Sequence, residues 1–288
     1  MQIEILAAES LGVRSMATFI RTRDLTMMID PGAALGPKRY GLPPDEIEWQ
    51  RLRELKDKIR QKLKECDLVV ITHYHYDHYD PEWAKDFKGK RVILKDPFNA
   101  INRNQAQRAR ELLKRLESNQ IFWETAEEKE IISGTTQIIL SPSLTHGPER
   151  RFGGVVSVFV KEDGFGFLHS SDLNGPVEEK AVSFIKEMRP QVLFLDGPAT
   201  YLGPRYGLDF LKRAQKMLQE LLLELPLKTL IIDHHTLRDL AWKNWAKPIL
   251  EVAVQQGTRV LTAAEYMNEE PLLLEALRKE RYKASRKN

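Results

Sequence analysis

Cysteine is almost absent from this sequence of 288 residues, which contains only Cys66. A single cysteine excludes a disulfide bond within the chain and a cysteine-rich zinc site. Cys66 lies in KECDLVVITH, immediately before a run of apolar residues. We therefore expect a buried core thiol and not a catalytic nucleophile.

Long apolar runs are missing too. No stretch approaches the ~18 consecutive apolar residues that a membrane-spanning helix needs. The beginning, MQIEILAAES, lacks the basic and apolar regions of a secretory signal. We expect a cytoplasmic protein with no membrane partner. The formal net charge of +3 is modest, so it neither requires nor excludes nucleic acid as a partner.

Flexible linkers, low-complexity segments and internal repeats are also absent. One α/β domain over residues 1–288 is the simplest interpretation. Short strands are predicted in the first and middle parts, and strands alternate with helices later. The spacing of apolar positions predicts helical insertions near 44–66 and 99–118. RVLTAAEYM (259–267) is predicted to be a short strand, and a basic helical tail ends the chain.

Histidine is scarce, but its distribution is uneven. Three of the seven histidines lie in ITHYHYDHYD (71–80), directly after the predicted buried strand DLVVITH. His146 follows another predicted strand, and His234 and His235 end a third. Functional sites usually lie on loops beyond strand ends, so this clustering indicates a site.

The spacing within residues 71–80 suggests a chemistry. In an extended chain, residues two apart project to the same side, so His73 and His75 can bind one metal ion. Asp77 and His78 follow at a tighter step and can face a second ion. Neutral imidazoles and carboxylates suit zinc, manganese or iron. Such a site lowers the pKa of a bound water towards ~7 and so provides a hydroxide nucleophile.

THYHYDH resembles the T-H-x-H-x-D-H signature of the metallo-β-lactamase superfamily of dinuclear metal hydrolases. The other superfamily motifs are present in chain order, in MMIDPG, SPSLTHGPE, HSSDLNG and LIIDHHT. Within the superfamily, SSDLNGP, LDGPATYLG and DHHTLRD are most similar to the UPF0282 family of predicted metal-dependent hydrolases. The resemblance runs from about residue 3 to about residue 266. It implies an αββα four-layer sandwich, with two β-sheets inside and helices outside.

The resemblance also implies roles for individual residues. The ligands of a first metal ion would be His73, His75 and His146. The ligands of a second ion would be Asp77, His78 and one of His234 and His235. Asp172 would bridge the two ions, and Asp30 would orient ligands from behind them. We count Asp77 and Asp30 as catalytic residues. Two divalent cations are the expected cofactors, with zinc favoured and iron or manganese as alternatives.

The doublet His234–His235 departs from the family pattern. The first histidine after the strand stands where the family's ligand stands, which favours His234. Strand alternation would send His235 to the opposite side, unless the strand has already ended. Both residues therefore remain candidates.

Other polar residues near the predicted site have weaker assignments. His169 is expected to make a structural hydrogen bond near Asp172. Asp196, at the end of a buried strand, is either a loop-capping residue or a substrate contact. Tyr201 and Arg205 lie on a loop long enough to reach a substrate, and the alternative is that they are ordinary surface residues.

The predicted substrate is a phosphoester or nucleotide-related compound. This prediction rests on the basic segment NRNQAQRARELLKRLE, on the basic tail and on the phosphodiesterase branches of the superfamily. The alternatives are hydrolysis of a carboxylic ester, lactone or thioester, and a metal-dependent binding or sensor protein without turnover. Basic faces are also commonly just solvated surface. The oligomeric state is left open.

Overall fold

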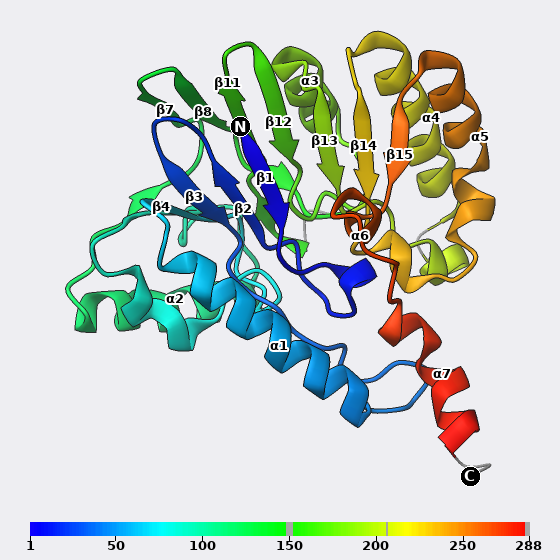
Figure 1. Cartoon of the computed structure of the whole chain (residues 1–288), viewed down its shortest axis with the longest axis horizontal. Coiled ribbons are helices and arrows are strands. Elements are labelled where there is room, and N and C mark those ends of the chain that lie inside the picture. The colour runs from blue at the N-terminus through cyan, green and yellow to red at the C-terminus, as the bar shows by residue number, and fades with distance from the viewer. Residues whose placement is uncertain (148–151, 206, 286–288) are drawn as a thin grey trace.

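The computed structural model describes residues 1–147, 152–205 and 207–285. The strands within these residues form two facing sheets and a small hairpin (Figure 1). The strands of the first sheet are, in spatial order, β1 (Gln2–Ile5), β2 (Thr18–Arg21), β3 (Thr26–Ile29), β4 (Leu68–Ile71), β5 (Arg91–Leu94) and β6 (Glu124–Thr125). Pairing is antiparallel from β1 to β3 and parallel from β3 to β6.

The second sheet has the same mixed character. Its strands are, in order, β15 (Arg259–Leu261), β14 (Thr229–Ile232), β13 (Val192–Leu195), β12 (Phe165–His169), β11 (Val158–Glu162), β8 (Thr136–Leu140) and β7 (Glu130–Ser133). Pairing is parallel from β15 to β12 and antiparallel from β12 to β7. β9 (Leu144–Thr145) and β10 (Gly154–Val155) form the separate hairpin.

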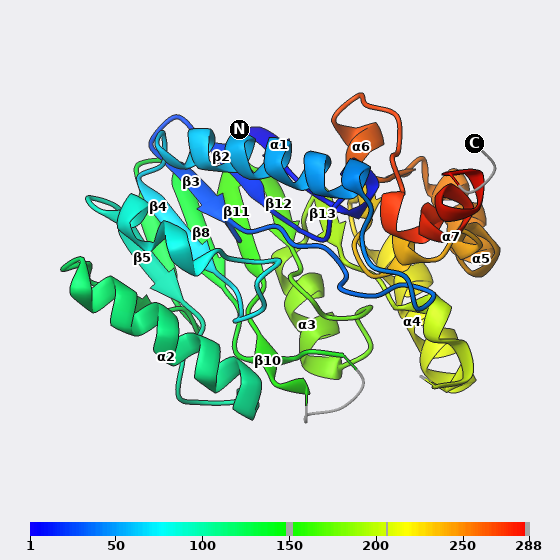
Figure 2. The same ribbon diagram turned by 90° about the horizontal axis from the view of Figure 1, so that it is seen from below.

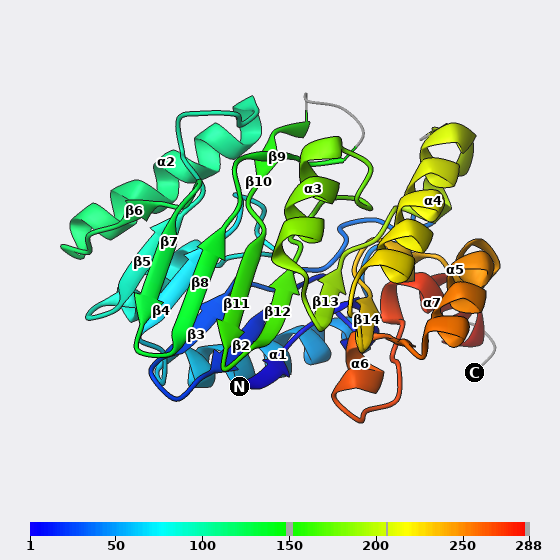
Figure 3. The same ribbon diagram turned by 90° about the horizontal axis from the view of Figure 1, so that it is seen from above.

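Helices provide the outer layers, because parallel neighbours in a sheet need a crossover connection. In the first sheet these crossovers are α1 (Glu46–Leu63) and α2 (Arg103–Ser118). In the second sheet they are α3 (Glu179–Met188), α4 (Leu208–Glu224) and α5 (Trp242–Gln256). Figures 2 and 3 show α1 on one side of the paired sheets and α3 and α4 on the other. The predicted αββα four-layer sandwich is confirmed.

Side-chain alternation along the strands builds two apolar cores. Val158 and Val160 of β11 join the core between the sheets, whereas Phe159 joins the core beneath the helices of the second sheet. Phe167 and Leu168 of β12 divide in the same way. This period-two pattern requires both faces of the second sheet to be covered.

The predicted helices near 44–66 and 99–118 are α1 and α2, each slightly shorter than expected. Asp45 begins α1 through a capping box with Glu48. The strand predicted over 259–267 is wrong beyond Leu261. A second capping box, between Thr262 and Glu265, begins the short helix α6 (Ala263–Tyr266) instead.

The predicted basic tail forms helix α7 (Leu274–Ser285) and packs against α1. Arg278 is fully buried, and its Nη2 donates to Glu48 Oε1 at 2.7 Å. Arg281 donates to Asp45 Oδ2 at 2.8 Å and to Glu48 Oε2 at 2.9 Å. These two arginines are structural and are not free basic surface. The tail residues 286–288 lie outside the described residues. None of the described helices is both long and apolar enough to cross a membrane.

Candidate metal centre

Polar residues gather beyond the carboxyl ends of the parallel strands in both sheets. Asp30 follows β3, and the segment 72–80 follows β4. In the second sheet, Asp172, Asp196 and the doublet 234–235 follow β12, β13 and β14. Parallel strands end at one edge of a sheet, so these segments meet at the edge that faces the viewer in Figure 2.

The carboxylate of Asp30 is hydrogen-bonded to the loop that follows β4. Its Oδ1 accepts a hydrogen bond from Thr72 N at 2.8 Å. Its Oδ2 lies 2.7 Å from both Thr72 Oγ1 and His78 Nδ1. The next turn needs Gly32, because a Cβ there would lie 2.2 Å from the backbone nitrogen of Tyr79. The two loops therefore touch through their backbones.

The chain turns sharply after β14, which ends at Ile232. His234 has a φ of 37°, a left-handed conformation that costs a non-glycine residue roughly 1–3 kcal/mol. Asp233 Oδ1 fixes the turn by accepting from His234 N at 2.8 Å. The rings of His234 and His235 consequently lie close together, with centroids 4.5 Å apart. Strand alternation does not separate them, because the strand has ended.

A first group of potential ligand atoms surrounds one point. The group contains His73, His75, His146 and Asp172. Each residue contributes one nitrogen or oxygen atom, and these atoms all lie within 4.8 Å of one another. His73 Nε2 lies 3.0 Å from His75 Nδ1 and 3.5 Å from Asp172 Oδ2. Donor atoms ~2.0–2.2 Å from one tetrahedral ion lie roughly 3.3–3.6 Å apart. The 3.5 Å separation lies within this range and the 3.0 Å separation is slightly shorter, so the group is close to the spacing of metal ligands.

A second group lies beside the first and contains Asp77, His78 and His234. His234 Nε2 lies 3.6 Å from Asp77 Oδ2. Arg238 Nη2 also lies 3.0 Å from His234 Nε2. An ion bound to His234 would have to displace this contact.

Asp172 connects the two groups. Its Oδ2 faces the first group, 3.9 Å from His146 Nε2. Its Oδ1 faces the second, 3.1 Å from His78 Nε2 and 3.5 Å from His234 Nε2. The preceding residue, Ser171, has a φ of 58°, so another strained turn sets this orientation.

In His146, His78 and His73, the ring nitrogen that faces away from the proposed metal positions has a hydrogen-bond partner. His146 Nδ1 donates to the backbone carbonyl of Asp172 at 2.8 Å. His78 Nδ1 contacts Asp30, and His73 Nδ1 lies 3.2 Å from Thr72 Oγ1. Such outer contacts fix the orientation of a ligating imidazole and leave the other nitrogen for a metal.

Burial and charge set the protonation of the two groups differently. Burial lowers the pKa of His73 and of His146 to about 4, and that of His75 to about 3. These rings are therefore neutral at pH 7, as metal ligands must be. Burial also acts on His78, but the carboxylates of Asp172 and Asp30 outweigh it and raise its pKa well above the usual value.

Two buried atoms at the centre argue for metal. His78 Nε2 and Asp172 Oδ1 lie 3.1 Å from each other, but neither makes a well-aligned hydrogen bond within the described part of the chain. Leaving such atoms unsatisfied is costly unless another group pairs with them. The donor set of imidazoles and carboxylates is the one that zinc, iron and manganese accept. The residues present fit two divalent cations.

The structure also places the residues with weaker assignments. His235 Nδ1 lies 2.8 Å from Asp196 Oδ2, and its Nε2 lies 3.7 Å from Asp172 Oδ2. His169 is fully buried and donates to Met16 O at 3.0 Å, so its structural role is confirmed. The side chain of Arg205 lies outside the described residues.

The sequence analysis missed Arg238 and Glu9. Both side chains are almost fully buried, and Arg238 Nε lies 3.0 Å from Glu9 Oε2. They link the segment after β1 to the turn after β14, beside His234. Arg238 lies within DHHTLRD, but nothing in that motif indicates that its side chain turns inwards.

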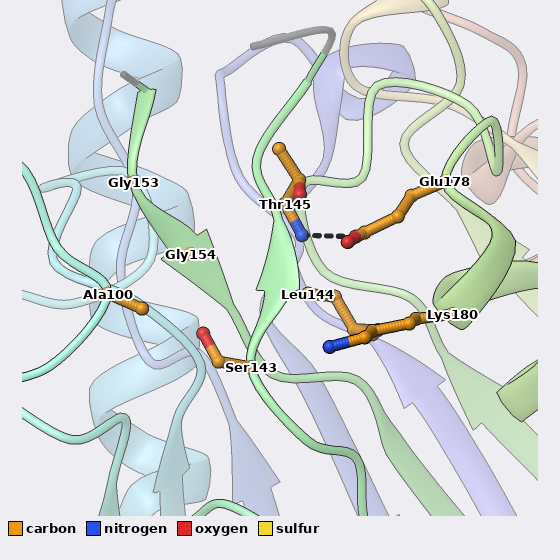
Figure 4. Close-up of a pocket in the computed structure, with 8 residues that line it drawn as sticks. All are labelled: Ala100, Ser143, Leu144, Thr145, Gly153, Gly154, Glu178 and Lys180. Carbon is orange, nitrogen blue, oxygen red and sulfur yellow. Dashed lines mark hydrogen bonds between the residues drawn. The ribbon is translucent and has the colours of Figure 1, made fainter. Parts of the chain in front are cut away.

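A pocket of about 300 Å³ lies along the hairpin of β9 and β10, the two strands on either side of His146 (Figure 4). Its polar side chains are Ser143, Thr145, Glu178 and Lys180. The backbone nitrogen of Thr145 donates to Glu178 Oε2 at 2.6 Å and secures the hairpin to the start of α3.

Comparisons with known proteins agree with this geometry. The family model described as Metallo-beta-lactamase superfamily matches residues 12–198. A UPF0282 protein of Sulfurisphaera tokodaii is 41% identical over 292 residues, covering 100% of this chain and 94% of that protein. The chain belongs to the metallo-β-lactamase superfamily and to its UPF0282 family. A UPF0282 protein of Korarchaeum cryptofilum is also 41% identical and covers 98% of this chain and 94% of its own length.

Solved structures similar to this UPF0282 protein share its fold at low sequence identity. CmlA, a diiron beta-hydroxylase from Streptomyces venezuelae, has a TM-score of 0.54 at 15% identity, covering 90% of this chain and 52% of its own. An isothiocyanate hydrolase from Delia radicum gut bacteria has a TM-score of 0.51 at 14% identity, covering 88% and 95%. The fold thus accommodates different chemistries, and this member's activity depends on its own site.

Proposed function

We propose that this UPF0282 protein is a dinuclear metal-dependent hydrolase. The observation that carries the proposal is the position of Asp172, whose two oxygens face two separate groups of buried histidines. The first ion would be held by His73, His75, His146 and Asp172. The second would be held by Asp77, His78, His234 and Asp172. Zinc is the ion we favour, with iron or manganese as alternatives.

Two divalent ions in these positions would supply an activated water as nucleophile and would neutralise negative charge that develops on the substrate. The chain's own residues would prepare the site for this chemistry. Asp30 orients His78, and the carbonyl of Asp172 orients His146. The more accessible side of the cluster, where a substrate would enter, contains His75, Asp77 and His235.

For the substrate we propose an anionic compound, with a phosphoester as the favoured class. Arg39 supports this choice, since no carboxylate of the described residues pairs with its guanidinium. The guanidinium carbon lies 4.0 Å from the Tyr201 ring centroid and 4.7 Å from that of Tyr40. Arg39 Nη2 donates to the backbone carbonyl of Arg238 at 2.5 Å, four residues after His234. A positive charge is therefore held against the backbone of the segment that follows β14.

Residues 1–288 are proposed to act as one domain. The buried contact between Arg278 and Glu48 ties the C-terminal helix to α1, and Glu9 ties the N-terminal segment to Arg238.

The experiment is metal analysis followed by assays with phosphodiesters, phosphomonoesters, carboxylic esters and lactones. We expect close to two metal equivalents per chain and turnover of a phosphoester that is lost with a chelator. Asp172→Ala should lose both metal and activity, whereas Arg39→Gln should keep the metal and raise KM. Turnover of carboxylic esters or lactones alone would replace the substrate class. Wild-type protein that binds no metal would contradict the proposal.

A further inference from the structure

His235 and Asp196 form a pair of side chains that the two proposed ligand sets do not use. His235 is nine per cent exposed, and its Nδ1 lies 2.8 Å from Asp196 Oδ2. Asp196 is fully buried at the end of β13 and also accepts from Asn174 N at 2.6 Å. The carboxyl group therefore fixes the imidazole ring and occupies Nδ1, so Nε2 is the nitrogen left for another contact.

The remaining nitrogen, His235 Nε2, faces Asp172 on the side of the first group. It lies 3.7 Å from Asp172 Oδ2, the oxygen that faces His73 and His146. That group already offers a complete tetrahedral set without His235. His235 does belong to another possible ligand group, with Asp172 and His234, so its contact with Asp196 is what argues for a different role. The ring of His235 is also farther from His146 than from His234, with centroid distances of 6.2 Å and 4.5 Å.

The two consecutive histidines thus have different surroundings. His234 is completely buried and shares the second group with Asp77 and His78. His235 lies at the accessible rim, and a buried carboxyl group aligns its ring.

We propose that His235 is a substrate-contacting residue and not a metal ligand, and that Asp196 is the residue that positions it. This inference rests on the proposed function. In a bound complex, His235 Nε2 would make a hydrogen bond to a polar atom of the substrate held over Asp172. A contact that strengthens as the reaction proceeds raises kcat more than it lowers KM.

Cobalt is the probe that separates a ligand from a substrate contact, because its visible absorption reports the coordination of the ion directly. The experiment loads wild type, His235→Ala, His235→Gln, Asp196→Asn and the matched control His234→Ala with cobalt. Bound cobalt, its absorption spectrum, the melting temperature, kcat and KM are measured for each protein. The hydrolysed substrate found in the ester assays serves for the kinetics.

We expect His235→Ala to bind as much cobalt as wild type with an unchanged spectrum, and to lose about 10²-fold in kcat. His235→Gln should recover part of that loss, because its amide can make a hydrogen bond from a similar position. Asp196→Asn should keep the cobalt spectrum and lower kcat. His234→Ala should lose cobalt and alter the spectrum.

Two results would overturn the inference. Loss of cobalt or a changed spectrum in His235→Ala would make His235 a ligand. Unchanged cobalt binding with unchanged kcat would exclude a substrate contact. Both outcomes leave the proposed function intact, whereas wild-type protein that binds no cobalt contradicts the proposed function itself. If Asp196→Asn melts at a much lower temperature, the two His235 variants still decide the question.

Discussion

Asp30 Oδ2 lies 2.7 Å from His78 Nδ1, and both side chains are completely buried. Asp30 also accepts two hydrogen bonds from Thr72, and these bonds fix the orientation of the carboxylate that contacts His78. This arrangement sets the direction in which His78 Nε2 points.

Asp30→Ala should therefore weaken binding of the second metal ion without removing a direct ligand. Loss of such an outer partner typically costs ~10–100-fold in metal affinity or activity. Calorimetric titration of the metal-free variant measures the effect. His169→Asn is a control, because it changes a buried hydrogen bond to Met16 elsewhere behind the centre. Wild-type metal affinity in Asp30→Ala would contradict an orienting role.

The two metal ions should bind with unequal affinity. Filling the first group displaces no proton at pH 7, since burial lowers the pKa of His73 to about 4 and that of His75 to about 3. Filling the second group requires His78, whose pKa is raised, to lose a proton. It also requires Arg238 to release His234.

Lowering the pH from 8 to 6 should consequently weaken the second binding step far more than the first. The sign follows from competition, because a metal and a proton cannot share one imidazole nitrogen. Zinc titrations at several pH values, followed by calorimetry in two buffers, measure both the affinity and the released protons. Two steps with the same pH dependence would contradict the assignment.

The buried pair between Arg278 and Glu48 should stabilise the docking of the C-terminal helix. Both side chains have no exposed area, so Arg278→Ala leaves a buried carboxylate whose one remaining ion-pair partner among the described residues is Arg281. Breaking such a pair costs about 3–5 kcal/mol in free energy of unfolding. Lys279→Ala removes a positive charge from the exposed side of the same helix and should change stability by less than ~0.5 kcal/mol. Urea unfolding measures the free energy of unfolding of both variants. Equal losses of stability would show that the buried pair contributes no more than an exposed charge.

The exposed arginines of α2 offer a test of phosphate preference. Arg103 and Arg110 are exposed, whereas Arg108 packs over the Tyr76 ring at 4.5 Å and donates to Tyr74 O at 3.4 Å. If α2 helps to capture a polyanionic substrate, replacing Arg103 and Arg110 with glutamine should raise KM, leave kcat nearly unchanged and flatten the salt dependence.

Arg108→Gln is the matched control, since it removes the same charge from a packed position and should mainly lower stability. KM measured between low and high salt for each variant gives the answer. Wild-type behaviour of the double variant at every salt concentration would make this face of α2 solvated surface, and the small ester or lactone would then be the favoured substrate.

The sequence by itself determined much of the architecture and the candidate site. Period-two alternation in the strands and helical spacing over 44–66 and 99–118 are local patterns, so they are visible without a structure. The metal-binding interpretation of THYHYDH is local as well, because residue type and short spacing decide which side chains can share an ion. The strand predicted over 259–267 is correct as far as Leu261 and wrong beyond it, although the local signal of a capping box, Thr262 and Glu265, is present in the sequence.

Only the tertiary structure decided relationships between segments that are distant in sequence. Asp196 lies 39 positions before His235, and their contact depends on β13 and β14 ending side by side. Whether Arg278 is free or buried depends on Glu48, 230 positions away. The positive φ of His234 turns two consecutive histidines towards one centre, although strand alternation would separate them. Residue type determines what a side chain can bind, but packing decides which partner it meets and how much water remains around it.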